Sequence, residues 1–416
     1  MRILSLHKQI LFPRDTGGKI RVLNIVEQLA RRHDMTFLCN LRDGEEAYLE
    51  QMQALGMRLE TVPMRQSRRG SWRYGRDLAL NLLSPYPFTV SRNYEAPLRA
   101  RAAALVREVP YDLLICDTVV MARHVTDLAV PARILFQRNV EAQLLQRHAQ
   151  TSAGWLRRRY MALQWRRMRR FEGACGRSFD AVIAVSEADR QTFAREYGWR
   201  HVRAIDTGVD VHYFKPGETG EQPGRVLFVG SLDWLPNQEG VDFFVHQVWP
   251  AVLRAHPAAT FQIVGRNPAG GMRRLARLEG VQVVGTVPDV RPYLSAAQVV
   301  VVPLLVGGGT RIKIFEAMAM GKAVVSTTIG AEGLDVEPDK HIVLADSAAD
   351  LAQAVSGLLD DGAKRRRIGQ VAQGLVTEHY STETVGRQFE QICEETVEQA
   401  RLAAPAQADP APQGRP

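Results

Sequence analysis

The sequence contains few cysteines and no long apolar run. Four cysteines are spread along the chain: Cys39, Cys116, Cys175 and Cys393. None stands in a CxxC pair, which excludes a disulfide framework and a cysteine zinc site. The longest apolar stretch, residues 299–306, is about eight residues long and contains Pro303, whereas a membrane span needs about twenty. Residues 1–8 are too short and too soon charged for a signal peptide, so we expect a soluble cytoplasmic protein in a reducing compartment.

Motifs of common cofactor and metal sites are missing as well. The glycine pair Gly17-Gly18 does not belong to a GxGxxG, so the fingerprint of a dinucleotide site is absent. The sequence has no Asp-x-Asp pair and no grouping of His and Asp at the spacing of metal ligands. We therefore expect no metal and no bound cofactor.

Charge is present but unevenly distributed. Residues 1–206 hold 34 basic and 21 acidic side chains, a net charge of +13. Residues 207–416 hold 19 and 24, a net charge of −5. This asymmetry indicates that the first half faces an anionic partner, which could be nucleic acid, a membrane surface or an acidic substrate.

The length and pattern of the chain predict two α/β domains. At 416 residues it exceeds the roughly 250–300 residues at which single cores stop growing. Short apolar, β-branched runs alternate with segments of helical periodicity, which is typical of doubly wound, Rossmann-like domains. In the first half the expected strands are Arg2–Leu6, Met35–Asn40, Arg58–Val62, Asp112–Cys116, Arg133–Phe136 and Ala181–Val185. In the second half they are Arg225–Val229, Thr260–Val264, Val281–Val284, Val299–Leu305, Ala323–Ser326 and His341–Leu344.

Linker composition sets the domain boundaries. The stretch 205–224 is rich in Gly, Pro and Glu, so we expect an N-terminal domain over 1–206 and a C-terminal domain over 207–380. Residues 381–402 are predicted to form a helix. Residues 403–416 are nearly all Ala, Pro, Gln and Gly, which predicts a disordered tail.

The segment from Val299 to Lys322 carries the strongest sign of a binding site. A buried strand runs into three glycines, Gly307 to Gly309, and then into a helix that Gly321 ends. Glycines let the backbone approach a ligand closely, and a helix N-terminus favours phosphate. We expect backbone N–H groups and two cations to bind phosphate, and a glutamate to reach the hydroxyls of a ribose. The residues concerned are Gly308, Gly309, Thr310, Arg311, Lys313 and Glu316. The alternative is a glycine turn with surface charges.

A second glycine pair opens the first helix of the other half. Gly17 and Gly18 follow a loop from His7 that is long for a connection between a strand and a helix. Long loops at strand ends are often functional, so we expect this pair to contact substrate. The alternative is a solvated loop with a helix cap.

These motifs together resemble the GT-B glycosyltransferases of family four. The motifs are Gly17-Gly18, Thr207-Gly208-Val209-Asp210, Phe214 to Pro216, Phe228-Val229-Gly230-Ser231, and Gly309 to Gly321 with Glu316. The resemblance spans about residues 1–400. It implies two Rossmann-like domains that face each other across a cleft. It also implies metal-independent, retaining transfer of a sugar from a nucleotide diphosphate donor, held mainly by the C-terminal domain, to an acceptor held by the N-terminal domain. The last helix in such enzymes typically crosses back to the first domain.

The sequence departs from the family pattern at several donor-binding positions. The first glutamate of the family's Glu-x7-Glu pattern is replaced by Gly308, whose main chain can substitute for it. Ser231 and Asn237 stand where the family often has an Arg and a Lys that bind the diphosphate. Arg311 and Lys313 are the expected replacements, because full charges there stabilise the negative charge that develops on the leaving diphosphate.

Two residues of the first half are further catalytic candidates. Arg138 stands where the family frequently has a His, in the loop after a central strand. An arginine is no general base at neutral pH, but it can stabilise a phosphate leaving group. Asp117, at the end of the preceding strand, is expected to face the cleft. Its alternative role is a strand-end cap.

Two basic segments of the first half contain aromatic residues. Residues 155–171 hold seven arginines and an apolar stripe at Met161, Trp165 and Met168, and a second cluster runs from Arg65 to Arg76. Such segments suit an anionic lipid surface or RNA. The alternative is a stripe packed on the sheet with a solvated arginine face. We expect a membrane, because acceptors in the resembled family are often lipid-linked, and we expect no nucleic acid.

These expectations predict an enzyme of cell-surface polysaccharide or glycoconjugate synthesis. It would bind a nucleotide-sugar donor and a lipid-linked or glycan acceptor, and it would dock on the inner face of the plasma membrane. A nucleotide-sugar epimerase of the GT-B fold is one alternative. A non-catalytic descendant that binds a nucleotide sugar or nucleic acid is the other, motivated by the departures at Ser231, Asn237 and Arg138.

Overall fold

The computed structural model shows two compact units. It describes residues 1–14, 16–64, 66–67, 70–151, 154–217, 220–266, 270–306 and 312–403. The first unit comprises Met1–Ile205 with Gly386–Pro416, and the second comprises Asp206–Val385. All but the first residue of the predicted tail, 403–416, lies outside the described residues.

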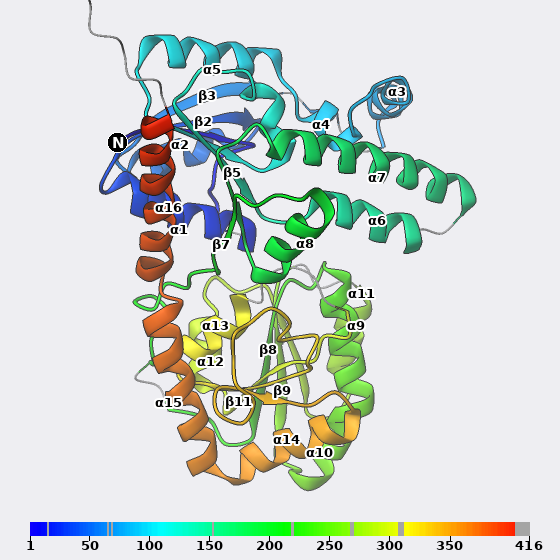
Figure 1. Ribbon diagram of the computed structural model, residues 1–416. Coiled ribbons are helices and arrows are strands. Elements are labelled where there is room, and N and C mark those ends of the chain that lie inside the picture. The colour runs from blue at the N-terminus through cyan, green and yellow to red at the C-terminus, as the bar shows by residue number, and fades with distance from the viewer. Residues whose placement is uncertain are drawn as a thin grey trace, which may run out of the picture. The chain divides into compact units, whose positions relative to one another are not determined.

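The first unit is built on a parallel sheet of seven strands in the order β3-β2-β1-β4-β5-β6-β7 (Figure 1). The strands are β1 (Arg2–His7), β2 (Asp34–Arg42), β3 (Arg58–Met64), β4 (Leu113–Asp117), β5 (Ala132–Gln137), β6 (Ala181–Ala184) and β7 (Val202–Ala204). The α-helices are α1 (Gly17–Ala30), α2 (Leu49–Gln53), α3 (Trp72–Asn81), α4 (Phe88–Arg92), α5 (Ala96–Glu108), α6 (Glu141–Thr151), α7 (Trp155–Gly176), α8 (Glu187–Tyr197) and the later turns of α16 (Thr382–Ala403). Two short 3₁₀ helices are η1 (Glu46–Tyr48) and η2 (Val119–His124).

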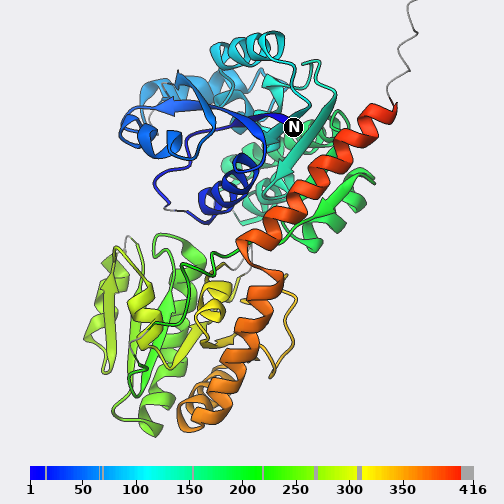
Figure 2. The same cartoon turned by 90° about the vertical axis from the view of Figure 1, so that its left-hand side faces the viewer.

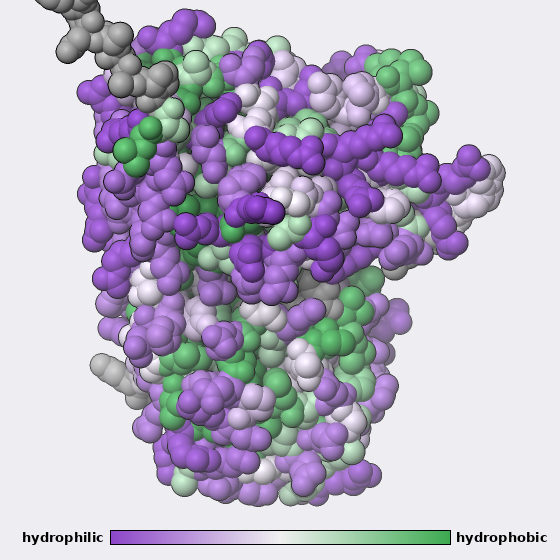
Figure 3. Space-filling model, in the orientation of Figure 1, coloured by the Kyte–Doolittle hydropathy of each residue, from purple (hydrophilic) through white to green (hydrophobic). Residues whose placement is uncertain are grey.

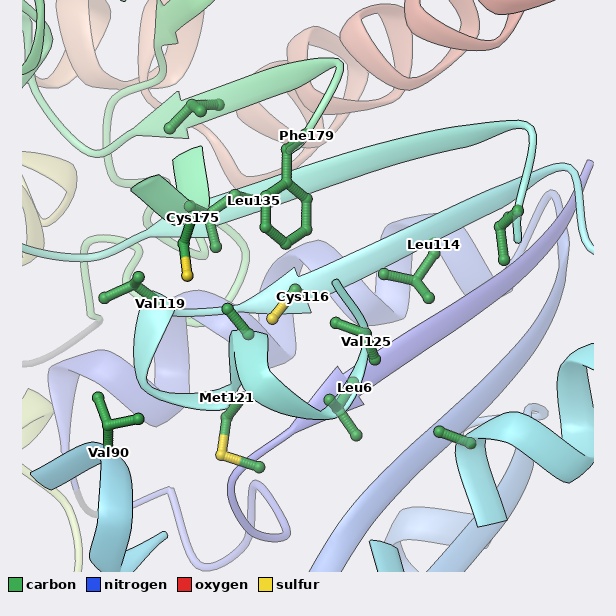
Figure 4. Packing of buried hydrophobic residues seen from close by; sticks show 14 of the residues in the cluster. Leu6, Val90, Leu114, Cys116, Val119, Met121, Val125, Leu135, Cys175 and Phe179 are labelled. Carbon is green, nitrogen blue, oxygen red and sulfur yellow. The ribbon is translucent and has the colours of Figure 1, made fainter. Parts of the chain in front are cut away.

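Both faces of this sheet are buried, which explains why its strands are continuous apolar runs. Successive side chains point to opposite faces, so neighbouring residues of β5 enter different layers. Leu135 joins a core with Leu6 and Cys116 that the helices on one face cover (Figure 4). Phe136 meets Phe389 of α16 on the other face, with ring centroids 5.3 Å apart.

Helix α16 therefore belongs to the first unit over its later turns (Figure 2). Besides the ring contact, Arg401 donates to Asp112 at 2.8 Å and Arg32 donates to Glu390 at 2.8 Å. Both are exposed ion pairs that contribute little on their own, so the apolar packing fixes the helix.

The second unit has a parallel sheet of six strands in the order β10-β9-β8-β11-β12-β13. Its strands are β8 (Arg225–Val229), β9 (Thr260–Val264), β10 (Val281–Gly285), β11 (Val299–Val302), β12 (Ala323–Ser326) and β13 (Val343–Leu344). Its helices are α9 (Leu235–Phe243), η3 (Phe244–Val248), α10 (Trp249–Ala255), α11 (Gly270–Arg274), η4 (Leu275–Arg277), α12 (Arg291–Ala296), α13 (Ile312–Ala319), α14 (Ala348–Asp360) and α15 (Gly362–His379). Phe228 and Val301 join the core on one face, whereas Leu227, Val300 and Phe315 join the core on the other.

The predicted α/β fold with two doubly wound units is confirmed. The strand predictions differ from the structure in places, and the predicted run His341–Leu344 forms a strand only over Val343–Leu344. The run Val299–Leu305 is too long, because the strand ends at Val302, directly before Pro303. Strand β7 was missed because it is only three residues long and buries only Val202. Among the described residues, every helix is too short or too polar to cross a bilayer.

Candidate functional site

A cluster of three polar side chains lies at the carboxyl ends of three neighbouring strands in the first unit. His7 is the last residue of β1, Asp117 is the last residue of β4, and Arg138 directly follows β5. Asp117 lies 3.3 Å from His7 Nδ1 through one carboxylate oxygen and 3.2 Å from Arg138 Nε through the other. His7 and Asp117 are buried, whereas the side chain of Arg138 is 26% exposed. We call these three residues the Asp117 cluster.

The Asp117 carboxylate stays charged in this buried position. Burial raises its pKa, but the positive charge of Arg138 and the contact with His7 outweigh burial and hold the pKa below its usual range. The neighbouring Lys8 shows the opposite effect. Burial and the positive charges of Arg42 and Arg138 lower the pKa of its ammonium group. The charged Asp117 carboxylate therefore holds the Arg138 guanidinium in position.

His7 is held in place by its own strand and by the next one. Its Nε2 lies 2.6 Å from the hydroxyl of Ser5, and its ring stacks on Phe37 with centroids 4.1 Å apart. Sequence reasoning did not assign a role to His7. The signal was a polar residue at the carboxyl end of a buried strand, where ligands of parallel sheets bind.

The backbone directly after Asp117 is strained. Thr118 has φ 72° and ψ 148°, a conformation that β-branched residues rarely adopt. The N–H of Thr118 donates to the carbonyl of Phe136 at 2.8 Å, and the N–H of Val119 donates to Gln137 Oε1 at 2.7 Å. Such strain costs on the order of 1–3 kcal/mol and clusters at functional sites.

The predicted glycine pair lies at the start of α1, next to this cluster. Gly17 is the first residue of α1, and the side chain of Thr16 caps the helix by accepting from the N–H of Lys19. A Cβ on Gly18 would lie 2.9 Å from Arg138 Nη1. Gly18 therefore lets the guanidinium approach the helix N-terminus, and the two add positive potential that favours an anionic ligand.

Glu172 of α7 holds the loop that carries Arg138. Its carboxylate accepts from Gln137 Nε2 at 2.8 Å, before the loop, and from the N–H groups of Glu141 and Ala142 at 3.0 and 3.1 Å, after it. The hydroxyl of Tyr197 donates to it at 2.7 Å. Burial raises the pKa of Glu172 to about 7 despite these donors. Sequence reasoning missed this residue, whose only signal was a glutamate in an arginine-rich helix.

A second cluster follows β8 in the second unit, and it brings together three predicted residues. Lys313 Nζ donates to Asn237 Oδ1 at 2.8 Å, and Asn237 Nδ2 donates to the carbonyl of Ser231 at 2.7 Å. The ammonium group also lies 4.5 Å from the centre of the Phe228 ring. A Cβ on Gly230 would lie 2.6 Å from Lys313 Nζ, so a larger residue there would displace the ammonium group from this position. Lys313 therefore places its charge beside Asn237, at the turn after β8.

Arg266 adds a further cation to this turn. It follows β9, and its Nη2 donates to the hydroxyl of Ser231 at 3.2 Å. That hydroxyl in turn donates to Asp233 at 2.7 Å. Sequence reasoning missed Arg266, although an arginine just after a buried strand was a usable signal. We call Ser231, Asn237, Arg266 and Lys313 the Lys313 cluster.

Glu316 lies one turn of α13 after Lys313 and is half-buried. Burial raises its pKa to about 7, although the charge of Lys313 acts in the opposite direction. A carboxyl group with this pKa is partly protonated at neutral pH, so it can both donate to and accept from a ligand hydroxyl. The predicted residues Gly308, Gly309, Thr310 and Arg311 lie outside the described residues.

One group of possible metal ligands occurs among the described residues. It consists of His33, Glu390 and Glu394, whose ligand atoms lie within 4.8 Å of one another. His33 Nε2 is 3.0 Å from Glu390, which also pairs with Arg32. The Glu390 carboxylate is therefore already paired with Arg32 and His33. The group includes no residue of the Asp117 or Lys313 cluster.

The arginine-rich helix α7 combines a packed stripe with an exposed start. Met168 is buried and Trp165 packs against the core, so these two residues of the predicted stripe face the sheet. Trp155 and Leu156, at the start of the helix, are exposed. The alternative interpretation, a stripe that packs on the sheet, is thus correct for Trp165 and Met168. Arg65, Arg68 and Arg69 of the second basic cluster lie outside the described residues.

Two family models match the chain in succession. Residues 16–213 match the model described as Glycosyltransferase Family 4, and residues 223–361 match the model described as Glycosyl transferases group 1. The chain belongs to the family-four-like GT-B glycosyltransferases. The strand ends described above therefore lie in the two parts of the chain that match glycosyltransferase models.

Solved structures and a curated relative agree with this family. HepE from Anabaena, in complex with UDP and glucose, superposes with a TM-score of 0.66 at 19% identity, over 94% of this chain and 98% of that one. Sucrose-phosphate synthase from Thermosynechococcus elongatus gives 0.68 at 18% identity, over 96% and 100%. At such identities these structures show the fold alone.

The curated relative is a GDP-mannose-dependent monoacylated alpha-(1-6)-phosphatidylinositol monomannoside mannosyltransferase from Corynebacterium glutamicum. It is 26% identical over 239 residues, which make up 52% of this chain and 62% of the relative. The chain spans between about half and two thirds of the lengths of the curated relatives it matches.

Proposed function

We propose that the protein transfers a sugar from a nucleotide diphosphate sugar to a lipid-linked or polysaccharide acceptor, with retention of configuration and without a metal. The donor binds the second unit and the acceptor binds the first. The observation that carries the proposal is the position of Lys313 and Arg266 around the turn after β8, in a chain whose two halves match glycosyltransferase models. The similarity to HepE, which was solved with UDP and glucose, supports a nucleotide-sugar donor.

The Lys313 cluster suits the diphosphate of the donor. Breaking a bond between sugar and phosphate builds negative charge on the leaving diphosphate, and fixed cations stabilise that charge. Lys313 is oriented by Asn237 and the ring of Phe228, so little reorganisation is needed when the anion binds. Glu316 would hold ligand hydroxyls, and the glycines 308–309 with Thr310 and Arg311 would complete the site.

The Asp117 cluster suits the acceptor side of the reaction. Arg138 is the most exposed of its three members, so it is the one that meets ligand. Asp117 fixes the Arg138 guanidinium, and buried His7 supports Asp117 from the other side. Because Arg138 carries a permanent charge, we assign it the stabilisation of negative charge on the acceptor, with Asp117 as its positioning partner.

Turnover tests this function directly. UDP- and GDP-sugars are screened by thermal shift, because a ligand that binds only the folded state raises its stability. The stabilising donor is then incubated with the protein and a bacterial lipid extract. We expect nucleoside diphosphate release and sugar on the lipid fraction that depend on both donor and extract. A new epimer of the donor without any extract would instead establish the epimerase.

A lipid-linked acceptor lies in a membrane, so we also propose that the first unit docks on an anionic membrane surface. A hydrophobic patch covers α3 beside the largely hydrophilic surface of α7 (Figure 3). Leu83 is 88% exposed and Trp155 is 68% exposed. Arg157, Arg158 and Arg159 follow Trp155 on α7, and Arg167 donates to the carbonyl of Leu82, next to Leu83. Exposed apolar side chains next to cations suit the interface of an anionic bilayer. The mannosyltransferase relative, which is named for a phosphatidylinositol monomannoside, supports a lipid acceptor for this protein.

Liposome flotation tests docking. We expect flotation with anionic vesicles that falls with salt, and weaker flotation for Trp155→Ser than for the control Trp234→Ser on the second unit. Flotation that is independent of salt and of lipid charge would contradict docking.

A further inference from the structure

The first unit contains a cavity of about 730 Å³ whose lining includes no residue of the Asp117 or Lys313 cluster. Helices α3, α4, α6 and α7 line it, together with the residue that follows β1. Its volume lies within the roughly 300–1,000 Å³ that is typical of small-molecule sites.

The walls of the cavity are tied to one another by hydrogen bonds. Gln164 of α7 donates to Asn81 Oδ1 of α3 at 3.0 Å and accepts from the N–H of Phe88 of α4 at 2.7 Å. Arg167 of α7 donates to the carbonyl of Asn81 at 2.7 Å. The cavity is therefore preformed, which lowers the entropy cost of binding a ligand.

One part of the lining is apolar and continues onto the exposed surface. Leu78, Leu145 and Met161 line the interior. Leu82 and Leu156 also line it, yet they are 51% and 66% exposed. An apolar chain that enters from the exposed surface would thus meet a continuous hydrophobic wall.

Another part of the lining is cationic and contains polar atoms without partners. Lys8, Arg92 and Arg157 line the cavity from three different elements. Arg92 Nε, the Thr89 hydroxyl and the Tyr160 hydroxyl are buried, and none has a hydrogen-bond partner among the described residues. Buried polar atoms that stay unpaired cost free energy, and all three residues that carry these atoms line the cavity, so its wall is polar on this side.

The cationic part of the cavity lies close to the Asp117 cluster. Lys8 directly follows His7 in the chain, and its ammonium group is within electrostatic reach of Arg138. A ligand whose charged group meets Lys8 is therefore placed next to the residues that we assign to the acceptor side.

We propose that this cavity binds a lipid phosphate, with its apolar chain along Leu78, Leu82 and Leu156 and its phosphate between Lys8, Arg92 and Arg157. Only the identification of this lipid as the acceptor rests on the proposed function. Binding itself is measurable without any turnover.

Direct titration of the full-length protein tests the proposal. The probes are farnesyl phosphate below its micellar concentration, farnesol and inorganic phosphate, each followed by calorimetry. We expect farnesyl phosphate to bind at least tenfold more tightly than either of the other two. Equal affinity for inorganic phosphate would identify a plain anion site, equal affinity for farnesol would identify a plain apolar pocket, and either result overturns the proposal.

Two matched pairs of variants locate the binding. Arg157→Gln is compared with Arg158→Gln, because both arginines are exposed on α7 and only Arg157 lines the cavity. Leu82→Gln is compared with Leu83→Gln for the same reason. We expect at least fivefold weaker binding of farnesyl phosphate in the first member of each pair and less than twofold change in the second. Equal effects within the pairs would overturn the assignment to this cavity.

The same proteins separate this proposal from the proposed function. Nucleoside diphosphates are titrated into each variant, and we expect unchanged affinity because none of the four substitutions touches the Lys313 cluster. If wild-type protein binds farnesyl phosphate with the expected pattern but neither binds nor turns over any nucleotide sugar, the cavity assignment stands and glycosyl transfer is wrong.

Discussion

At the carboxyl ends of β1, β4 and β5, the first unit places a buried carboxylate between His7 and Arg138, whereas the second unit places Lys313 and Arg266 around the turn after β8. In the first unit the charge of Arg138 is directly opposed by Asp117. In the second unit the groups that contact Lys313 include an amide oxygen and an aromatic ring, neither of which carries a net charge. The first unit thus pairs Arg138 directly with a buried carboxylate, whereas we propose that Lys313 and Arg266 of the second unit bind an anion.

Removing the carboxylate of the Asp117 cluster gives the largest expected effect. Breaking a buried ion pair from one side leaves an uncompensated charge, so Asp117→Ala should lower the free energy of unfolding by about 3–5 kcal/mol. The control is Asp127→Ala, which removes an exposed pair with Arg99 and should cost no more than about 1 kcal/mol. Denaturant unfolding measures both. Similar losses for the two variants would show that the Asp117 cluster is not a buried ion-pair site.

The buried Glu172 predicts a pH dependence that the exposed glutamates lack. Its pKa is about 7 in the folded state and near the usual value of 4.5 in the unfolded state. The folded state therefore keeps a proton that the unfolded state has lost, and this stabilising contribution is full below about pH 4.5 and disappears as the pH rises through 7. Between pH 5 and 7.5 the wild type should lose about 2 kcal/mol more than Glu172→Gln.

The control for Glu172 is Glu187→Gln, because Arg190 lowers the pKa of that exposed glutamate. Unfolding titrations at several pH values measure the slopes. A slope for Glu172→Gln that equals the wild-type slope would show that this carboxyl is ionised in the folded protein at pH 5.

Arg266 predicts a smaller effect, on binding and not on folding. Arg266→Gln should weaken binding of a nucleoside diphosphate about tenfold, equivalent to about 1.4 kcal/mol, because one charge-assisted contact is lost. Arg254→Gln, on the C-terminal turn of α10, is the control and should bind like wild type. Calorimetric titration distinguishes them, and unchanged affinity in Arg266→Gln would remove Arg266 from the donor site.

The strain at Thr118 predicts the smallest effect. Glycine tolerates a positive φ and alanine does not, so Thr118→Gly should be about 1 kcal/mol more stable than Thr118→Ala. Thr192 in α8 is the matched control, where the helix should reverse the order. If alanine is the better residue at both positions, the backbone after Asp117 is not strained.

Most of the fold could be predicted from the sequence, because strands that are buried on both faces are continuous apolar runs. Strand β7 was not predicted, because three residues are too few to show a periodic pattern. The site residues that belong to one local sequence motif could be predicted. Lys313 and Glu316 belong to the helix after the glycine loop, and Gly18 belongs to the first turn of α1.

The remaining site residues depend on strand order, which local sequence does not contain. His7 and Asp117 are 110 residues apart and meet because β1 pairs with β4. Arg266 meets Ser231 because β8 pairs with β9. Glu172 reaches the loop after β5 only through the packing of α7 on α6. Sequence periodicity places residues on a face, whereas these contacts require the topology of the whole sheet.

The most direct test of the division between the units is a titration of one nucleoside diphosphate, UDP or GDP, into two variants. Lys313→Gln and Arg138→Gln each remove one positive charge, in the second and first unit respectively. We predict that Lys313→Gln binds the nucleotide at least tenfold more weakly than wild type, whereas Arg138→Gln binds it within twofold. Loss of affinity in Arg138→Gln with wild-type affinity in Lys313→Gln would contradict the account.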